Sequence, residues 1–176
     1  VVIWIVGRDY FIASSQQNDL ETVSLYQAYL ETDDQESGLK LLNSYEDTVY
    51  ADFVRLNEAK RNFQKGELDR AIEFLQTVIE NNVSSNKFNP LEAAARTRLA
   101  KIYLENEDYT SVLSLYQNTN ELTSTMLEQR ADAENALGQF SNARASYMLA
   151  LQSSTNQASR ALINMKISDL EGEDLE

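Results

Sequence analysis

The amino-acid sequence predicts an all-α protein in which helical hairpins stack one after another to form a solenoid. Three observations lead to this fold class. The chain of 176 residues holds one proline and five glycines, and its many Ala, Leu, Glu and Gln residues favour helix. Apolar residues recur at spacings of three and four, which is the periodicity of an amphipathic helix. One helical phrase also occurs three times along the chain.

The repeated phrase is a turn followed by a helix with small, aromatic and aliphatic residues at fixed offsets. Its turns are Gly66, Glu107 and Gly138, where Glu107 takes the place of a glycine. These turns are 41 and 31 residues apart. The residues at the common offsets are Leu68, Ala71, Leu75 and Val78; Tyr109, Val112, Tyr116 and Thr119; and Phe140, Ala143, Tyr147 and Ala150.

Each turn is preceded, seven positions upstream, by an alanine on another helical segment. These alanines are Ala59, Ala100 and Ala131. A small residue lets the second helix of a hairpin approach closely, and Ala71 and Ala143 complement it there. The larger residues then fill the groove between neighbouring hairpins. A period of roughly 34 residues with these offsets resembles the tetratricopeptide repeat.

Two capping signals mark the starts of later helices. A polar insertion before the second hairpin ends in a helix start, which explains the longer first interval. Asn89 can cap this helix, Pro90 suits its first position, and Glu92 is expected to reach back in a capping box. Thr125 and Glu128 give a second capping signal ahead of the third hairpin.

Further helices are expected before and after the three hairpins. Residues 19–30 form an amphipathic helix and residues 38–47 a short second helix, so this pair looks like a degenerate hairpin. A final helix at about 156–170 covers the last exposed face, as a solenoid cap should. A tetratricopeptide-like domain is therefore expected over residues 13–170, with about three and a half hairpins plus the C-terminal capping helix. Residues 171–176 are expected to be a frayed, solvated acidic tail.

The first residues of the chain are apolar and leave two interpretations open. Val1 to Val6 contain no polar side chain, but six residues cannot cross a bilayer, which needs about 20. They fit the last turns of a membrane-spanning helix, with Trp4, Tyr10 and Phe11 at the interface. They also fit a buried first turn of a helix in the domain. The residues by themselves favour neither interpretation.

Composition excludes several classes of function. The net charge is −13, so the surface repels nucleic acid and anionic lipid unless a local basic patch overrides it. The densest basic run, residues 55–70, has acidic residues threaded through it, which indicates a mixed, solvated helix face. The chain has neither cysteine nor histidine. Disulfides, thiolate nucleophiles, Ser-His and Cys-His relays, and zinc sites with nitrogen or sulfur ligands are thereby excluded.

No motif in the sequence indicates catalysis. A glycine-rich phosphate loop and a nucleophile elbow are both absent from the sequence. Carboxylates gather at residues 33–36, 105–108 and 171–174. The first two groups lie at predicted turns without the spacing and glycine of a calcium loop, so solvated turn residues explain them better. We therefore expect no enzymatic activity and no catalytic, cofactor-binding or metal-binding residues.

A polypeptide-binding surface is the function class that the repeats favour. In tetratricopeptide arrays the first helix of each hairpin lines the concave face, and a mixture of apolar anchors and Lys or Arg donors there could hold an extended peptide. The ordinary alternative is that the apolar residues are core and the charged ones surface. The candidate partner-binding residues are Phe53, Asn57, Lys60, Gln64, Arg98, Lys101, Gln129 and Asp132.

The order of motifs along the chain is more distinctive than the repeats alone. The segments are SLYQAYL, TVYADFVRLNEAK, GELDRAIEFLQ, RTRLAKIYL, RADAENALGQFSNAR and INMKISDL. In this order the sequence resembles the YfgM family, the ancillary subunit of the bacterial Sec translocon. The resemblance covers residues 1–172, and its most distinctive pieces are RADAENALGQFSNAR and INMKISDL.

The resemblance implies a location, partners and a role. It implies a single-pass protein of the bacterial inner membrane with its soluble domain in the periplasm, so that residues 1–12 are the trailing end of the N-terminal anchor and its interface. It further implies association with the Sec translocon (SecYEG), with a PpiD-like periplasmic chaperone, and with newly exported polypeptides. The alternative is a scaffold of an envelope complex that acts through self-association without client binding.

Overall fold

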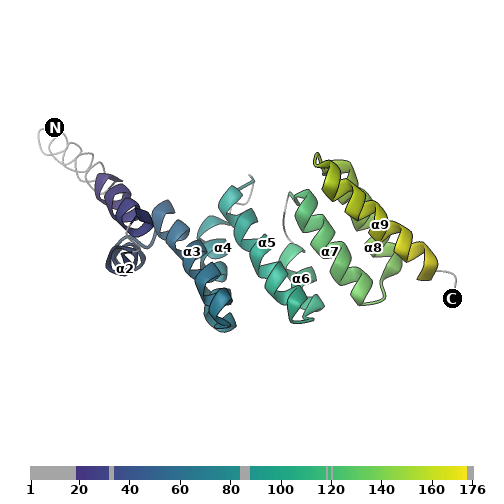
Figure 1. Ribbon diagram of the computed structural model, residues 1–176, viewed down its shortest axis with the longest axis horizontal. Helices are drawn as coiled ribbons and strands as arrows, with labels where there is room; N and C mark the ends of the chain where they lie inside the picture. Colours follow the sequence, from purple (N-terminus) through teal and green to yellow (C-terminus); the bar gives the residue numbers. More distant parts are fainter. Residues whose placement is uncertain (1–18, 32–33, 84–87, 118, 120, 174–176) are drawn as a thin grey trace, which may run out of the picture. The chain divides into compact units, whose positions relative to one another are not determined.

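The computed structural model is built from α-helices throughout the residues it describes, which confirms the all-α class (Figure 1). The chain divides into two compact units, residues 1–66 and residues 67–176. The predicted end of a membrane anchor, residues 1–12, lies outside the described residues. The described residues are 19–31, 34–83, 88–117, 119 and 121–173.

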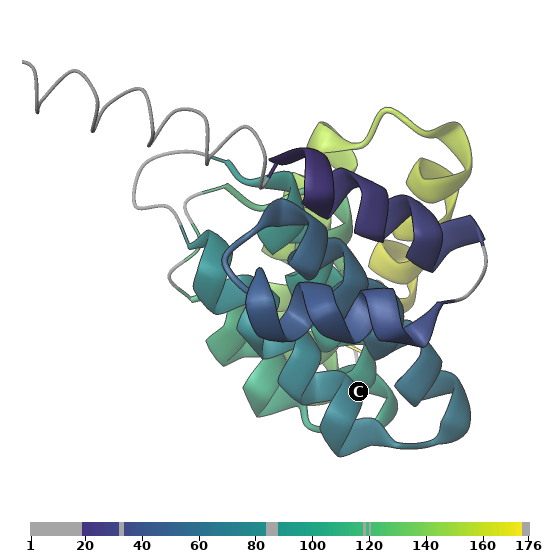
Figure 2. The ribbon, with the colours of Figure 1, turned by 90° about the vertical axis from the view of Figure 1, so that its left-hand side faces the viewer.

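Three helices, coloured purple to blue in Figure 2, make up the described part of the first unit. They are residues 19–31, α2 (Gln35–Ser44) and α3 (Val49–Lys65). Their common core contains Tyr29, Leu41 and Val54. A Cβ atom on Gly38 of α2 would lie 2.8 Å from the Tyr29 ring, so glycine is required for this close approach.

Local interactions fix both ends of α3. Thr48 has extended backbone angles, and its hydroxyl accepts a hydrogen bond from the backbone N–H of Ala51. The helix ends at Gly66, whose φ of 79° is in the left-handed region that glycine adopts most readily. A buried ion pair of 2.7 Å joins Arg55 to Asp52 within the first half of the helix.

The second unit stacks its helices in succession. α5 packs against α4 and α6, α7 packs against α5, α6 and α8, and α9 packs against α8. This neighbour-to-neighbour packing is that of a hairpin solenoid, so the predicted architecture is confirmed. The helices are α4 (Leu68–Asn82), α5 (Pro90–Glu105), α6 (Tyr109–Tyr116), α7 (Ser124–Ala136), α8 (Phe140–Ser153) and α9 (Gln157–Glu173).

Most residues that define the repeated phrase are buried, as predicted, whereas Leu68, Tyr109, Thr119 and Phe140 are half-buried. Ala100 and Ala131 on the first helices of the second unit's hairpins are fully buried, and so is Ala143 on α8. The turn residues also behave alike. Glu107 has a φ of 58°, close to the 72° of Gly138, so it takes the left-handed conformation of the glycine that it replaces.

Two details of the predicted helix starts are wrong. Asn89 caps α5 by accepting a hydrogen bond from the Leu91 N–H, but Glu92 does not complete a capping box. Its carboxylate instead accepts from Arg96 at 2.8 Å, one turn further along the helix. The cap of α7 is Thr123, whose hydroxyl accepts from the Met126 N–H, and Thr125 lies inside the first turn.

The last helix closes the second unit. α9 buries Ile163 and Leu170 in the core formed by α7 and α8, as the predicted capping helix should. It continues to Glu173, so the first residues of the predicted acidic tail, 171–173, extend the helix. Among the described residues, no helix combines the length and the apolar composition that crossing a bilayer would need.

Candidate functional site

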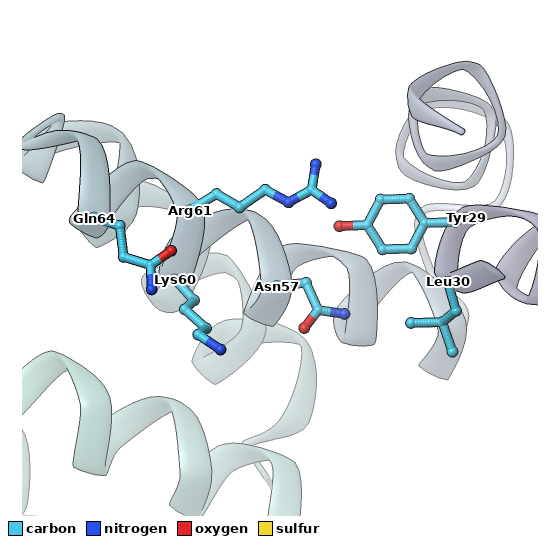
Figure 3. A pocket seen from close by; sticks show the side chains of 6 residues that line it. All are labelled: Tyr29, Leu30, Asn57, Lys60, Arg61 and Gln64. Carbon is cyan, nitrogen blue, oxygen red and sulfur yellow. The ribbon is translucent and has the colours of Figure 1, made fainter. Parts of the chain in front are cut away.

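Three of the predicted binding residues line one pocket in the first unit. Asn57, Lys60 and Gln64 lie three and four residues apart on one face of α3 (Figure 3). Tyr29 and Leu30, from the helix of residues 19–31, form the opposite wall. We call Asn57, Lys60 and Gln64 the α3 ladder. The pocket, which Arg61 also lines, has a volume of ≈ 280 Å³.

Tyr29 and Arg61 are held in place by a shared carboxylate. The Tyr29 hydroxyl donates to Glu58 Oε1 at 2.8 Å, and Arg61 Nη1 lies 3.6 Å from the same oxygen. The Arg61 guanidinium also lies 5.5 Å from the centroid of the Tyr29 ring. The Glu58 carboxylate therefore offsets the Arg61 charge and fixes both side chains.

Aromatic rings continue the surface beyond the α3 ladder. Phe53 is half-buried, with its ring centroid 5.6 Å from that of Tyr26 and 6.4 Å from that of Tyr50. Burial raises the pKa of Tyr26, and a hydrogen bond with the Asn57 side chain partly offsets this rise. Phe53 thus packs against other aromatic rings in a cluster and remains partly exposed to solvent.

Lys60 and Gln64 project from the ladder as exposed side chains. Within the described ranges the Lys60 ammonium has no carboxylate partner, although most other described lysines have one. Leu30 is 56% exposed at the opposite wall of the pocket. The pocket therefore presents one uncompensated positive charge beside an open apolar side chain.

The two candidates on α5 lie in the second unit. Arg98 and Lys101 are exposed and one turn apart on the same helix. Lys101 Nζ lies 3.8 Å from a carboxylate oxygen of Glu105, and both side chains are largely exposed. Such an exposed pair contributes little to stability, so Lys101 is free to exchange this contact for a partner's carboxylate.

The two candidates on α7 are already engaged within the protein. Gln129 Oε1 accepts from the Tyr116 hydroxyl at 2.6 Å, and its Nε2 donates to the Thr97 carbonyl at 3.0 Å. Asp132 accepts from the Tyr147 hydroxyl at 2.6 Å and from Lys166 Nζ at 2.7 Å. Both side chains thereby join α7 to neighbouring helices.

Lys166 is the centre of the contact between α7 and α9. Its Nζ also lies 2.8 Å from Glu128 Oε1 and 5.7 Å from the centroid of the Tyr147 ring. Burial lowers the pKa of Lys166, but its hydrogen bonds to Asp132 and Glu128 outweigh burial and leave that pKa above its ordinary value. The charged form of Lys166 therefore stabilises the docked capping helix.

Comparison with known protein families identifies the family to which the chain belongs. The family model described as a tetratricopeptide repeat-like domain matches residues 1–172. The chain belongs to the tetratricopeptide repeat-like domain family. No curated protein and no solved structure matches the chain significantly. Repeat arrays of this kind recognise other polypeptides on extended surfaces, which indicates protein–protein interaction as the general function.

Tyr29, Leu30 and Arg61 line the pocket of this tetratricopeptide repeat-like protein, yet sequence reasoning did not select them. Arg61 follows Asn57 by four residues, so helical spacing was a signal that it borders the same face. Tyr29 and Leu30 reach the pocket through packing between helices about 30 residues apart, because their positions depend on the close contact of α2 at Gly38.

Two of the predicted turn carboxylates of the tetratricopeptide repeat-like domain act as helix caps. Asp34 accepts from the Glu36 N–H at the start of α2, and Asp108 accepts from the Ser111 N–H at the start of α6. Hydrogen bonds from the Ser37 and Ser111 side chains lower the pKa values of Asp34 and Asp108 respectively. In the described ranges these carboxylates do not gather into a metal-binding group.

Proposed function

We propose that the protein is a non-catalytic interaction subunit that binds other polypeptides through α3 and α5, the first helices of its first two predicted hairpins. The observation that supports this most strongly is the open α3 ladder beside the aromatic cluster of Tyr26, Tyr50 and Phe53. Aromatic and cationic side chains at a partly exposed pocket are the residue types that contribute most to protein interfaces. In the second unit, exposed Arg98 and Lys101 form a separate candidate surface on α5.

We further propose that the protein is a member of the YfgM family and an ancillary subunit of SecYEG. The ordered motifs support this, above all RADAENALGQFSNAR and INMKISDL. On this proposal residues 1–12 are the trailing end of a single inner-membrane anchor, and the repeat domain lies in the periplasm. There it links the translocon to a PpiD-like chaperone and assists newly exported proteins.

A membrane tether suits a modest binding surface. Anchoring the repeat domain beside its partners makes association effectively intramolecular, at an effective concentration of order mM for a short linker. A pocket of ≈ 280 Å³ with one uncompensated lysine then suffices for a useful contact. Weak individual contacts also allow exported chains to be released quickly.

The second candidate function is a scaffold that acts through self-association without binding clients. Exposed apolar side chains on the last two helices favour it. Met148 and Leu149 of α8 are 59% and 51% exposed, and Leu162 and Met165 of α9 are 48% and 64% exposed. Exposed large apolar side chains are typical of interaction surfaces where they form a patch.

Co-purification from membranes tests the two candidates against each other. The full-length protein, extracted in mild detergent, should retain SecYEG and a PpiD-like chaperone in near-stoichiometric amounts. If it emerges without these partners but as a strong self-associate, the translocon proposal fails and the scaffold takes its place. Exchanging Met148 and Met165 for Gln gives the matched control, because it should disrupt self-association alone.

Charge reversal tests which surface makes the contact. Replacing Lys60, Arg98 and Lys101 together by Glu should weaken partner retention, because all three are exposed cations on first helices. Helicity and the melting temperature should stay unchanged, since exposed charges contribute little to stability. Undiminished retention would show that partners bind elsewhere on the protein.

A further inference from the structure

We infer that the α3 pocket receives an acidic segment of a partner polypeptide, with a carboxylate at Lys60 and a neighbouring aliphatic side chain against Leu30. This inference rests on the proposed interaction function and specifies the chemistry of the partner. It depends on the charges, the spacing and the exposed apolar surface at the pocket.

The charges at the pocket select an anion. None of the six lining residues carries a carboxylate, and two of them, Lys60 and Arg61, are cations. The Arg61 charge is offset by Glu58 at 3.6 Å, whereas Lys60 has no such partner within the described ranges. In a chain with a net charge of −13, this lysine leaves a local positive potential for one carboxylate.

The spacing of the α3 ladder suits an extended chain. Asn57 and Gln64 are seven residues apart, which is about 10 Å along a helix axis and about three residues of extended peptide. Lys60 lies between them on the same face (Figure 3). The amide side chains supply donors and acceptors for a peptide backbone on either side of the carboxylate.

The opposite wall selects an apolar neighbour for the acidic residue. Leu30 is 56% exposed, and Tyr29 beside it is fixed by its hydrogen bond to Glu58. An aliphatic side chain that covered Leu30 would remove apolar surface of both groups from water. The volume of ≈ 280 Å³ admits a few peptide side chains.

A polypeptide fits this pocket better than an anionic membrane surface does. Stable attraction to anionic lipid needs clusters of about four to eight basic residues, whereas the pocket offers one uncompensated lysine. The net charge of −13 repels a negative membrane as a whole. A short acidic segment avoids this repulsion because it meets the pocket alone.

Peptide titration of the full-length protein in detergent tests the inference. The probe is an amidated, fluorescein-labelled peptide of sequence Glu-Leu-Asp-Leu-Glu, and its neutral counterpart is Gln-Leu-Asn-Leu-Gln. The acidic probe should bind about tenfold more tightly than the neutral one, because it gains a charge-assisted hydrogen bond. Lys60→Glu should weaken binding of the acidic probe by about tenfold or more, and Leu30→Ala should weaken both probes.

Lys65→Glu is the matched control, because it makes the same charge change on the same helix at an exposed residue outside the pocket. It should change affinity by less than about twofold. Equal affinities for Lys60→Glu and the unaltered protein would overturn the inference. So would equal weakening by Lys60→Glu and Lys65→Glu, which would indicate attraction to overall charge.

Two further arms separate the possible sources of failure. If phosphatidylglycerol vesicles bind through Lys60 while the acidic probe does not, the pocket serves lipid and the inference is overturned. If Lys60→Glu retains SecYEG and the chaperone undiminished and binds the probe normally, the acidic-segment inference fails while the proposed function stands. Circular dichroism of each variant checks that the helices remain folded.

Discussion

The α3 ladder and the residues Gln129 and Asp132 of α7 occupy equivalent positions of the repeat. Their polar side chains nevertheless make different contacts. On α3, Lys60 and Gln64 project into a pocket. On α7, Gln129 and Asp132 bond to four groups on neighbouring helices. The position of a residue in the repeat therefore predicts which helix face it occupies. Contacts with neighbouring helices determine whether its polar atoms can still bind a partner.

The capping helix causes much of this difference. α9 brings Lys166 to Asp132 across 34 residues of sequence, and polar groups that become buried in such a contact need partners. The residues of α7 that would contact a peptide in an open repeat thus stabilise the end of the solenoid instead. In the first unit, Lys60 and Gln64 of the ladder remain exposed to solvent.

Of the substitutions that distinguish the two regions, Asp132→Ala should change the free energy of unfolding most. The substitution leaves the Tyr147 hydroxyl without its acceptor and weakens the hold on Lys166, so unfolding should become easier by about 2 kcal/mol. Urea denaturation measures this change. Asp132→Asn keeps an acceptor and should lose less. A change below about 0.5 kcal/mol for Asp132→Ala would remove the distinction between the regions.

Alkaline pH should weaken the end of the second unit selectively. The pKa of Lys166 is raised above its ordinary 10.5 in the folded protein. Its contribution to stability is therefore complete below about pH 10.5 and is lost as pH rises through the folded-state pKa. Burial also raises the pKa values of Tyr116 and Tyr147, whose contributions fall in the same direction.

The variant Lys166→Met isolates the lysine from the two tyrosines. Its deficit in free energy of unfolding, relative to the unaltered protein, should be largest near neutral pH and should shrink above about pH 10.5. Denaturation curves at several pH values check this dependence. A deficit that stays constant across that range would contradict the role assigned to the Lys166 charge.

Periodicity and turn chemistry were sufficient to predict the hairpins. The repeated offsets located the buried alanines, and Glu107 was placed correctly at a glycine position although its side chain gives no local signal for a positive φ. Such features are set by residues close in sequence. The spacing of small residues also predicted which helix faces meet, because close helix packing requires them.

Contacts between distant residues could not be predicted from the sequence. Glu134 of α7 is buried and accepts a hydrogen bond from Ser146 of α8, in addition to its local ion pair with Arg130 one turn earlier on α7. Only the folded hairpin brings Ser146 to Glu134. The network around Lys166 and the pocket wall formed by Tyr29 have the same origin. Cap positions were missed by two residues at α7, because Thr123 and Thr125 are chemically equivalent as candidates.

Substitutions in the hairpin turns test whether the two regions have the same turn backbone geometry. Gly66 and Gly138 both have a left-handed φ and no atom within 4 Å of an added Cβ. Replacing either by Ala should destabilise the protein by about 1 kcal/mol, through backbone strain alone. Glu107→Gly should stabilise by roughly 0.5 kcal/mol, because it relieves the same strain.

Thermal and urea unfolding of the three turn variants measure these changes. Similar losses at Gly66 and Gly138 would assign the difference between the regions to side-chain contacts. If the two losses differ by more than about 1 kcal/mol, the hairpin turns themselves are not equivalent. A destabilising Glu107→Gly would contradict the strain argument.

The smallest effects on stability are expected on the α3 ladder. Lys60→Ala and Gln64→Ala remove exposed side chains and should change the free energy of unfolding by less than about 0.5 kcal/mol. Chemical denaturation checks both variants, with Gln129→Ala as the counterpart on α7. Gln129→Ala should be clearly more harmful, because it leaves the Tyr116 hydroxyl without its acceptor.

Site-specific photo-crosslinking tests most directly the central claim that α3 contacts partners and α7 does not. A crosslinking residue replaces either Gln64 on the α3 ladder or Thr125, which is exposed on α7 one turn before Gln129. In the full-length protein within its membrane, position 64 should crosslink to another polypeptide and position 125 should not. Strong crosslinks from position 125 together with none from position 64 would contradict the account.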